Sequence, residues 1–184
     1  MTTNDGVCAV LDCLDAAKLP HMVTGGLAAN HYGVPRATND ADIIIQMEAE
    51  TFAVFARSLP PELSLDQQIS FETITGSKRH IISLAGTNFR IELFFLGEDA
   101  HHQERFRQRA RAFLDELNRG AWIPTAEDLI IQKLRWFRDK DRDDLRNILA
   151  VQGDALDFTH IHRWCDVHGT RGRLEEIQRS IPPI

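Results

Sequence analysis

Asp40 and Asp42 stand two positions apart, directly before a run of three isoleucines at residues 43–45. An isoleucine-rich run is typical of a buried strand, and side chains two positions apart in a strand lie on one face. Both carboxylates are therefore expected to project together from the edge of a core. Like charges at this spacing need a compensating cation, and Mg²⁺, which prefers oxygen ligands, is the natural partner. The alternative is an Asn39-Asp40 turn that only caps the strand.

Gly25 and Gly26 follow a short apolar run, residues 21–24, and precede a helical segment at residues 27–32. Without a Cβ, glycine lets the backbone approach a ligand closely. The free N–H groups at the start of a helix favour phosphate. The alternative is an ordinary turn, where glycine is common. The segment predicts a strand, a glycine turn, a short helix and a second strand at residues 41–46.

A third acid, Glu92, lies in the middle of residues 88–96, a segment apolar enough to predict a central strand. Gly86-Thr87 would join it as a hairpin to another strand at residues 79–84. A carboxylate inside so apolar a strand needs a partner. That partner is either a salt bridge to Arg79 or Arg90, or a metal ion shared with the aspartates, in which case Glu92 could also act as a general base.

The rest of the chain is read mainly as helices. Residues 105–118 are expected to be helical, although their second half could be a strand leading to Trp122. After Pro124 the apolar period changes to 3.6 residues, which indicates helices. The expected helices outside the motif are residues 5–18, 49–57, 125–137, a segment through 145–149, 158–168 and 174–180. We predict an α/β core over residues 1–120 and a C-terminal helical part over residues 121–184, packed on that core.

Composition excludes several classes of protein. Hydrophobic residues make up 43% and charged residues 26%, which is typical of a globular chain. The net charge of −6 excludes a global basic footprint for duplex DNA. No apolar run approaches the roughly 20 residues of a membrane span, and no secretory signal is evident. The three cysteines and eight histidines show no zinc spacing. We expect a cytoplasmic protein with reduced thiols and no membrane partner.

Two blocks of the sequence resemble a known family. Gly25-Gly26, thirteen further residues and Asp40-x-Asp42 resemble the signature of the DNA polymerase beta-type nucleotidyltransferase superfamily. More narrowly, the run is similar to that of the AbiEii-like bacterial nucleotidyltransferases, with matches at Gly33, Arg36, Thr38, Asp40 and Asp42. A second block, residues 124–149, is similar to the Glu-Asp-Leu-Ile-x-x-Lys-Leu segment of those families and its downstream Arg-Asp run, with matches at Glu127, Asp128, Lys133, Arg142 and Asp143.

The resemblance implies an α+β nucleotidyltransferase fold, in which a small mixed sheet flanked by helices precedes a C-terminal helical part. It also implies Mg²⁺-dependent transfer of a nucleoside monophosphate from an NTP to an acceptor hydroxyl, with release of pyrophosphate. The acceptor would be a tRNA, a protein or a small molecule. A toxin-like role with an antitoxin partner would follow from the AbiEii-like match.

The resemblance also assigns roles to individual residues. Asp40 and Asp42 would hold two metal ions, as phosphoryl-type transfer commonly requires, and Glu92 would complete the metal site and take a proton. The implied nucleotide-binding residues are Gly25 and Gly26 at the triphosphate, Lys133 at phosphate oxygens, Arg36 and Thr38 at phosphate or capping the Asp loop, and Asp143 orienting Lys133 or Arg142. From the residues alone, Lys133 could equally be a surface lysine.

Two positions depart from the family pattern. Leu27 follows the glycines where many members have Ser or Thr, and Glu92 stands where Asp is usual. Both departures favour an alternative function, a catalytically inactive nucleotide-binding or partner-binding module on the same fold. A third hypothesis is an antibiotic-adenylylating type of enzyme, because an acidic surface would suit a cationic acceptor.

Overall fold

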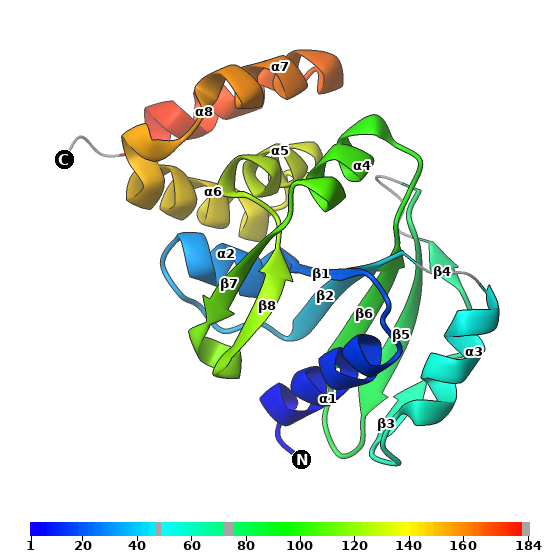
Figure 1. The fold of residues 1–184 in the computed structure, drawn as a ribbon. Helices are drawn as coiled ribbons and strands as arrows, with labels where there is room; N and C mark the ends of the chain where they lie inside the picture. Colours follow the sequence, from blue (N-terminus) through cyan, green and yellow to red (C-terminus); the bar gives the residue numbers. More distant parts are fainter. Residues whose placement is uncertain (47–48, 72–75, 182–184) are drawn as a thin grey trace.

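The computed structural model describes residues 1–46, 49–71 and 76–181 (Figure 1). Its helices are α1 (Thr3–Ala16), α2 (Gly25–Tyr32), α3 (Ala49–Ser58), α4 (Ala100–Arg107), α5 (Ala126–Trp136), α6 (Asp139–Gln152), α7 (Phe158–His168) and α8 (Arg171–Ser180), with short 3₁₀ turns η1 (Asp115–Leu117) and η2 (Gly153–Ala155). Its strands are β1 (His21–Thr24), β2 (Asp40–Ile45), β3 (Leu63–Leu65), β4 (Ser70–Phe71), β5 (Lys78–Leu84), β6 (Arg90–Phe95), β7 (Ala110–Leu114) and β8 (Arg119–Ile123). The predicted α+β class is confirmed.

The main sheet is mixed, and its strands run in the order β1-β2-β6-β5-β3, with β4 paired to β5. β2 pairs with β1 in antiparallel fashion and with β6 in parallel fashion. β5 and β6 form the predicted hairpin around Gly86. The parallel pairing matters most, because it sets β2 beside a strand that lies 50 positions further along the chain.

The two faces of this sheet have different partners. Ile43 and Ile45 of β2 and Leu93 of β6 lie in one buried cluster together with the apolar stripe of α1, which comprises Val7, Val10, Leu11 and Leu14. Ile44 and Phe94, at the intervening positions, form a separate small cluster with Phe106 of α4. Because side chains alternate along a strand, the face that carries Ile44 and Phe94 also carries Asp40, Asp42 and Glu92.

Residues 105–118 do not form the expected helix. α4 ends at Arg107, and β7 then pairs with β8 in a two-stranded sheet. This is the strand alternative for the second half of the segment. Ala110 to Leu114 alternate in the two-residue period of a strand, and pairing with β8 overrides the helical tendency of the arginines and alanines. Arg105 of α4 is buried, with 3% of its surface exposed.

The C-terminal helices α5–α8 follow β8 and lie together at one end of the molecule (Figure 1). Leu129, Leu134 and Ile148 from this part belong to the same buried cluster as Ile43 and Leu93 of the sheet. The division of the chain at residue 120 stays a prediction. Among the described residues, no helix is long and apolar enough to span a membrane.

Candidate active site

The register of β2 against β6 places the three acidic residues on one face of the sheet. Asp42 lies directly opposite Glu92, and Asp40 lies opposite Arg90. Asp42 is also paired with Thr24, the last residue of β1 before the glycine turn. Because directly paired residues of neighbouring strands point to the same side, the three carboxylates are neighbours at the point where β1 ends.

Asp42 is the most buried of the three carboxylates, with 7% of its surface exposed. Burial, together with the negative charges of Asp40 and Glu92, raises the pKa of its carboxyl group to about 7. Among the residues that the structure describes, none donates a hydrogen bond to Asp42. A buried carboxylate without a donor, facing two more carboxylates, has the electrostatics of a cation site.

The other two carboxylates have cationic partners. Nζ of Lys140 lies 3.4 Å from Oδ2 of Asp40, and Nη1 of Arg79 lies 2.6 Å from Oε2 of Glu92. The salt bridge from Glu92 to Arg79, one of the alternatives open from the sequence, is therefore present. Burial still raises the pKa of Glu92, although the positive charge of Arg79 opposes that effect.

The three carboxylates are adjacent but do not close around one point. Within the described part of the chain, the set of three potential ligands whose atoms all lie within 4.8 Å of one another is a different one, Asp99, His101 and His168. Oxygen donors and the negative charge around Asp42 suit a hard cation such as Mg²⁺. Holding such an ion with all three groups requires the side chains of Asp40 and Glu92 to turn from their present partners.

The glycine turn is fitted to these carboxylates. Gly25 has a φ of +63°, in the left-handed region, and a Cβ at this position would lie 1.8 Å from Oδ2 of Asp42. A Cβ on Gly26 would lie 2.9 Å from Oγ1 of Thr38. That hydroxyl donates to Oδ1 of Asp40 at 2.9 Å, so Thr38 orients the first aspartate. α2 begins at Gly25, two residues earlier than expected, and its free N–H groups therefore start at the turn itself.

Lys133 is buried, with 4% of its surface exposed, and lies between α5 and α6. Its Nζ lies 2.7 Å from Oδ2 of Asp144 and 3.4 Å from Oδ1 of Asp141. Asp144 also accepts two hydrogen bonds from the guanidinium of Arg36, at 2.6 Å and 2.8 Å. Burial of Asp144 would raise its pKa, but the hydrogen bond from Arg36 and the charge of Lys133 outweigh burial and lower it. The reading of Lys133 as a surface lysine is thus replaced by a buried ion network.

The structure corrects the expected place of Asp143. Its side chain is 63% exposed and pairs with Arg146, while Arg142 pairs with Glu176. The neighbouring Asp144 makes the contact to Lys133 that was expected of Asp143. Helical periodicity could have indicated this, because Asp144 lies three residues after Asp141 and four before Ile148, on the buried face of α6.

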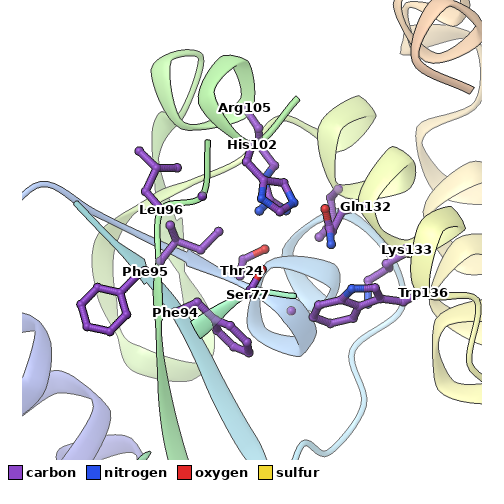
Figure 2. Close-up of a pocket in the computed structure, with 14 residues that line it drawn as sticks. Thr24, Ser77, Phe94, Phe95, Leu96, His102, Arg105, Gln132, Lys133 and Trp136 are labelled. Atoms are coloured by element: carbon purple, nitrogen blue, oxygen red, sulfur yellow. The ribbon is translucent and has the colours of Figure 1, made fainter. Parts of the chain in front are cut away.

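A pocket opens beside the turn and holds several residues that the sequence did not single out (Figure 2). Thr24, Gly25 and Lys133 line it, together with Phe94 of β6, Arg105 of α4 and Gln132 and Trp136 of α5. About 520 Å³ of space that no atom fills lies in this region, open solvent included. Within residues 1–46, 49–71 and 76–181, the buried atoms without a hydrogen-bond partner include Nε of Arg105, Oε1 of Gln132 and Nε1 of Trp136. Buried polar groups are normally paired, so these three atoms indicate a polar ligand.

Comparison with known proteins bears on the fold. No family model matches the chain, and no curated protein matches its sequence. Among solved structures, the antibiotic-resistance factor ANT(2'')-Ia in complex with adenylyl-2''-tobramycin is similar with a TM-score of 0.63 at 12% identity, covering 94% of this chain and 99% of that one. A nucleotidyltransferase-like protein from Paracoccidioides brasiliensis gives a TM-score of 0.55 at 14% identity over 97% and 94% of the two chains.

The lincosamide antibiotic adenylyltransferase LnuA, in its lincomycin-bound form, gives a TM-score of 0.52 at 13% identity, covering 80% of this chain and 96% of that one. At such low identities the likeness concerns the fold alone. The resemblance to the AbiEii-like family seen in the sequence is not confirmed by these comparisons. The small mixed sheet, the turn after β1 and the helices that follow make up the nucleotidyltransferase fold.

Proposed function

We propose that this protein transfers a nucleoside monophosphate from an NTP to an acceptor hydroxyl, with release of pyrophosphate. One observation carries the proposal: three carboxylates from β2 and β6 lie on one face of the sheet, beside a glycine turn that leaves no room for any side chain. The fold that the chain shares with two antibiotic adenylyltransferases supports the same chemistry.

In the proposed mechanism Asp40, Asp42 and Glu92 would hold Mg²⁺, which would supply neutralisation of the phosphate charge when bound. The backbone N–H groups at the start of α2 bind the triphosphate. The acceptor oxygen forms a bond to the α-phosphorus as the bond to the pyrophosphate oxygen breaks. Glu92 would accept the proton of the acceptor hydroxyl as the general base.

The pocket in Figure 2 is proposed to bind the nucleoside. Phe94 and Trp136, with ring centroids 6.4 Å apart, provide the apolar surface that a base requires. The unpartnered atoms of Arg105 and Gln132 supply a donor and an acceptor for the polar edge of the base. Lys133 stands between this pocket and Asp144, where its charge would act on phosphate oxygens.

The test is label transfer from each of the four α-labelled NTPs in Mg²⁺, with bulk tRNA, total cell protein and an aminoglycoside such as tobramycin as acceptors. We expect transfer to one acceptor class and a loss of at least about 100-fold in Asp42→Asn. Asp143→Asn, which changes an exposed carboxylate on the same protein, is the matched control. Transfer by Asp42→Asn at the wild-type rate would refute the mechanism. Labelling of tRNA or protein would support the toxin-like role, with an antitoxin as partner.

A second candidate is a nucleotide-binding module without transfer activity. The ion pair between Arg79 and Glu92 favours it, because a carboxylate held by an arginine is less available to a metal ion. Calorimetry distinguishes the two candidates. NTP binding without transfer to any acceptor, unchanged by Arg79→Ala, would support the module. Faster transfer in Arg79→Ala would show that the ion pair only restrains Glu92.

A further inference from the structure

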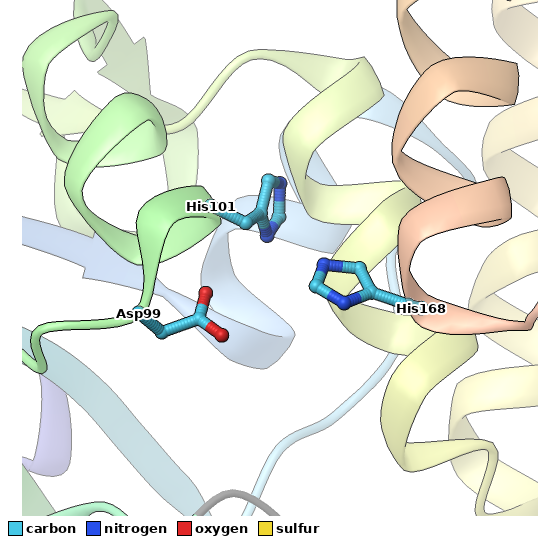
Figure 3. Close-up of side chains that lie close together, drawn as sticks. All are labelled: Asp99, His101 and His168. Atoms are coloured by element: carbon cyan, nitrogen blue, oxygen red, sulfur yellow. The ribbon is translucent and has the colours of Figure 1, made fainter.

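A second cluster of potential metal ligands comes from other elements than the carboxylates of the active site. Asp99, His101 and His168 each offer one ligand atom, and these atoms all lie within 4.8 Å of one another. Figure 3 shows the three side chains turned toward a common space. Asp99 is the N-cap of α4, His101 is in the first turn of that helix, and His168 is the last residue of α7. The cluster therefore joins two helices that lie far apart in the sequence.

Two imidazole nitrogens of the cluster have no hydrogen-bond partner among the described residues. They are Nδ1 of His101, a completely buried residue, and Nε2 of His168, which is likewise a buried atom. An unsatisfied polar atom in the protein interior destabilises the folded state. Two such atoms converging on one carboxylate therefore point to a bound group.

The surroundings of His101 are those of a metal ligand. Its Nε2 lies 3.2 Å from Oδ1 of Asp128, a fully buried carboxylate that also contacts Nε2 of His160 at 2.9 Å. Donation of the Nε2 proton to Asp128 leaves a lone pair on Nδ1, which faces the cluster. A carboxylate on the far nitrogen is the usual orienting contact of a metal-bound histidine.

We propose that Asp99, His101 and His168 bind a transition-metal dication of the zinc type. Two imidazoles and one carboxylate are the donor set of such an ion, whereas Mg²⁺ prefers oxygen alone. Bond lengths of about 2.0–2.1 Å place the ligand atoms of one tetrahedral zinc ion about 3.4 Å apart, so small side-chain rotations close the cluster. Asp99 also contacts both terminal nitrogens of Arg135 at 3.3 Å, and its two oxygens can serve the arginine and the ion together.

The site would tie α7 to α4. His102 and Arg105 of α4 line the pocket of Figure 2, and Nη1 of Arg135 contacts Nε2 of His102 at 3.3 Å. A metal at Asp99, His101 and His168 would therefore hold one wall of that pocket in place. This inference stands independently of the transfer reaction.

The experiment uses the full chain, stripped with a chelator and titrated with ZnCl₂ or MgCl₂ by calorimetry and by thermal unfolding. We expect one equivalent of Zn²⁺ to bind and raise Tm, with no such effect from Mg²⁺ in the same range. His168→Ala and Asp99→Asn should each weaken Zn²⁺ binding by at least about 100-fold. His162→Ala, on the same helix but outside the cluster, is the matched control and should bind as the wild type does.

Asp42→Asn separates this site from the active site, because its Zn²⁺ binding should be unchanged. Loss of binding in Asp42→Asn alone would place the ion at the active-site carboxylates and overturn the proposal. Wild-type affinity in both His168→Ala and Asp99→Asn, or no Zn²⁺ binding by the wild type, would also overturn it. Asp99→Asn keeps an oxygen to cap α4, so the test holds even if His168→Ala does not fold.

Discussion

At the scale of single residues, Gly25 is the position with the least freedom. A side chain there would adopt a left-handed backbone and collide with Oδ2 of Asp42. Gly86 has a similar φ of +76° but open space around it. A side chain at Gly86 would therefore cause backbone strain alone, whereas one at Gly25 would also collide with Asp42.

We therefore expect Gly86→Ala to lower the free energy of unfolding by about 1 kcal/mol, the cost of a left-handed alanine. Gly25→Ala should lower it by clearly more and abolish NTP binding, because Asp42 must move. Urea unfolding and calorimetry measure both effects. Equal losses in the two variants would mean that the contact with Asp42 is readily relieved.

The raised pKa of Asp42 predicts how the stability of the metal-free protein depends on pH. Its folded pKa of about 7 lies above the unfolded value of about 3.9. The folded state therefore holds the proton of Asp42 more tightly than the unfolded state does. The contribution of this proton to the free energy of unfolding is fully present below pH 4 and is lost as the pH rises through 7. Removing the charge with Asp42→Asn should raise stability at pH 8, by on the order of 3 kcal/mol, and should matter little at pH 4.

Thermal unfolding in EDTA from pH 4 to 8, wild type against Asp42→Asn, measures that difference. A variant less stable than the wild type at pH 8 would contradict the raised pKa. Asp40→Asn should show a smaller gain, because Lys140 partly compensates that carboxylate.

At the scale of elements, the contact between α5 and α6 depends on Asp144. This carboxylate holds both Arg36 and Lys133, whereas the adjacent Asp143 is exposed and pairs with Arg146. Breaking a buried ion network by removing one charge costs about 3–5 kcal/mol, and an exposed pair contributes at most about 1 kcal/mol.

Asp144→Asn should therefore lower Tm strongly and weaken NTP binding through the displaced Lys133. Asp143→Asn, one residue away on the same helix, should leave both nearly unchanged. Denaturant unfolding and NTP titration of the two variants provide the measurement. Equal effects of the two substitutions would contradict the assignment of the network to Asp144.

The helices and strands also show which parts of the fold could be predicted from the sequence. The isoleucine run of β2, the apolar segment of β6 and the glycine turn have strong local signals, and each was predicted. Their parallel pairing was not predicted, because β2 and β6 are 50 positions apart and the sequence of a strand does not identify its partner. For residues 110–114 the sequence predicts a helix with a strand as the alternative, because pairing with β8 decides their structure.

For the site residues too, the sequence indicates local features but not contacts between distant segments. Asp40, Asp42 and Glu92 were recognised because acids in apolar strands are unusual. Arg105, Gln132 and the cluster at Asp99 were not, since each matters through neighbours that are distant in sequence. The burial of Lys133 likewise depends on α6, which the apolar pattern of α5 alone does not reveal.

At the scale of the whole molecule, the shared core predicts cooperative unfolding. Leu129 and Ile148 of the C-terminal helices are buried in the same cluster as Ile43 of the sheet. We expect one calorimetric transition whose enthalpy equals the van't Hoff value. Two separate transitions would instead support independent domains on either side of residue 120, and a fragment of residues 1–120 would then fold alone.

The pairs formed by Arg79 with Glu92 and by Lys140 with Asp40 have a consequence for the order of binding. In the metal-free protein each pair neutralises one carboxylate of the active site, so a bare magnesium ion must compete with a cationic side chain already in place. A magnesium ion that binds together with a triphosphate brings negatively charged phosphate oxygens. The displaced arginine and lysine can then form ion pairs with these oxygens. We therefore expect magnesium and nucleotide to enter as one complex, each poorly retained without the other.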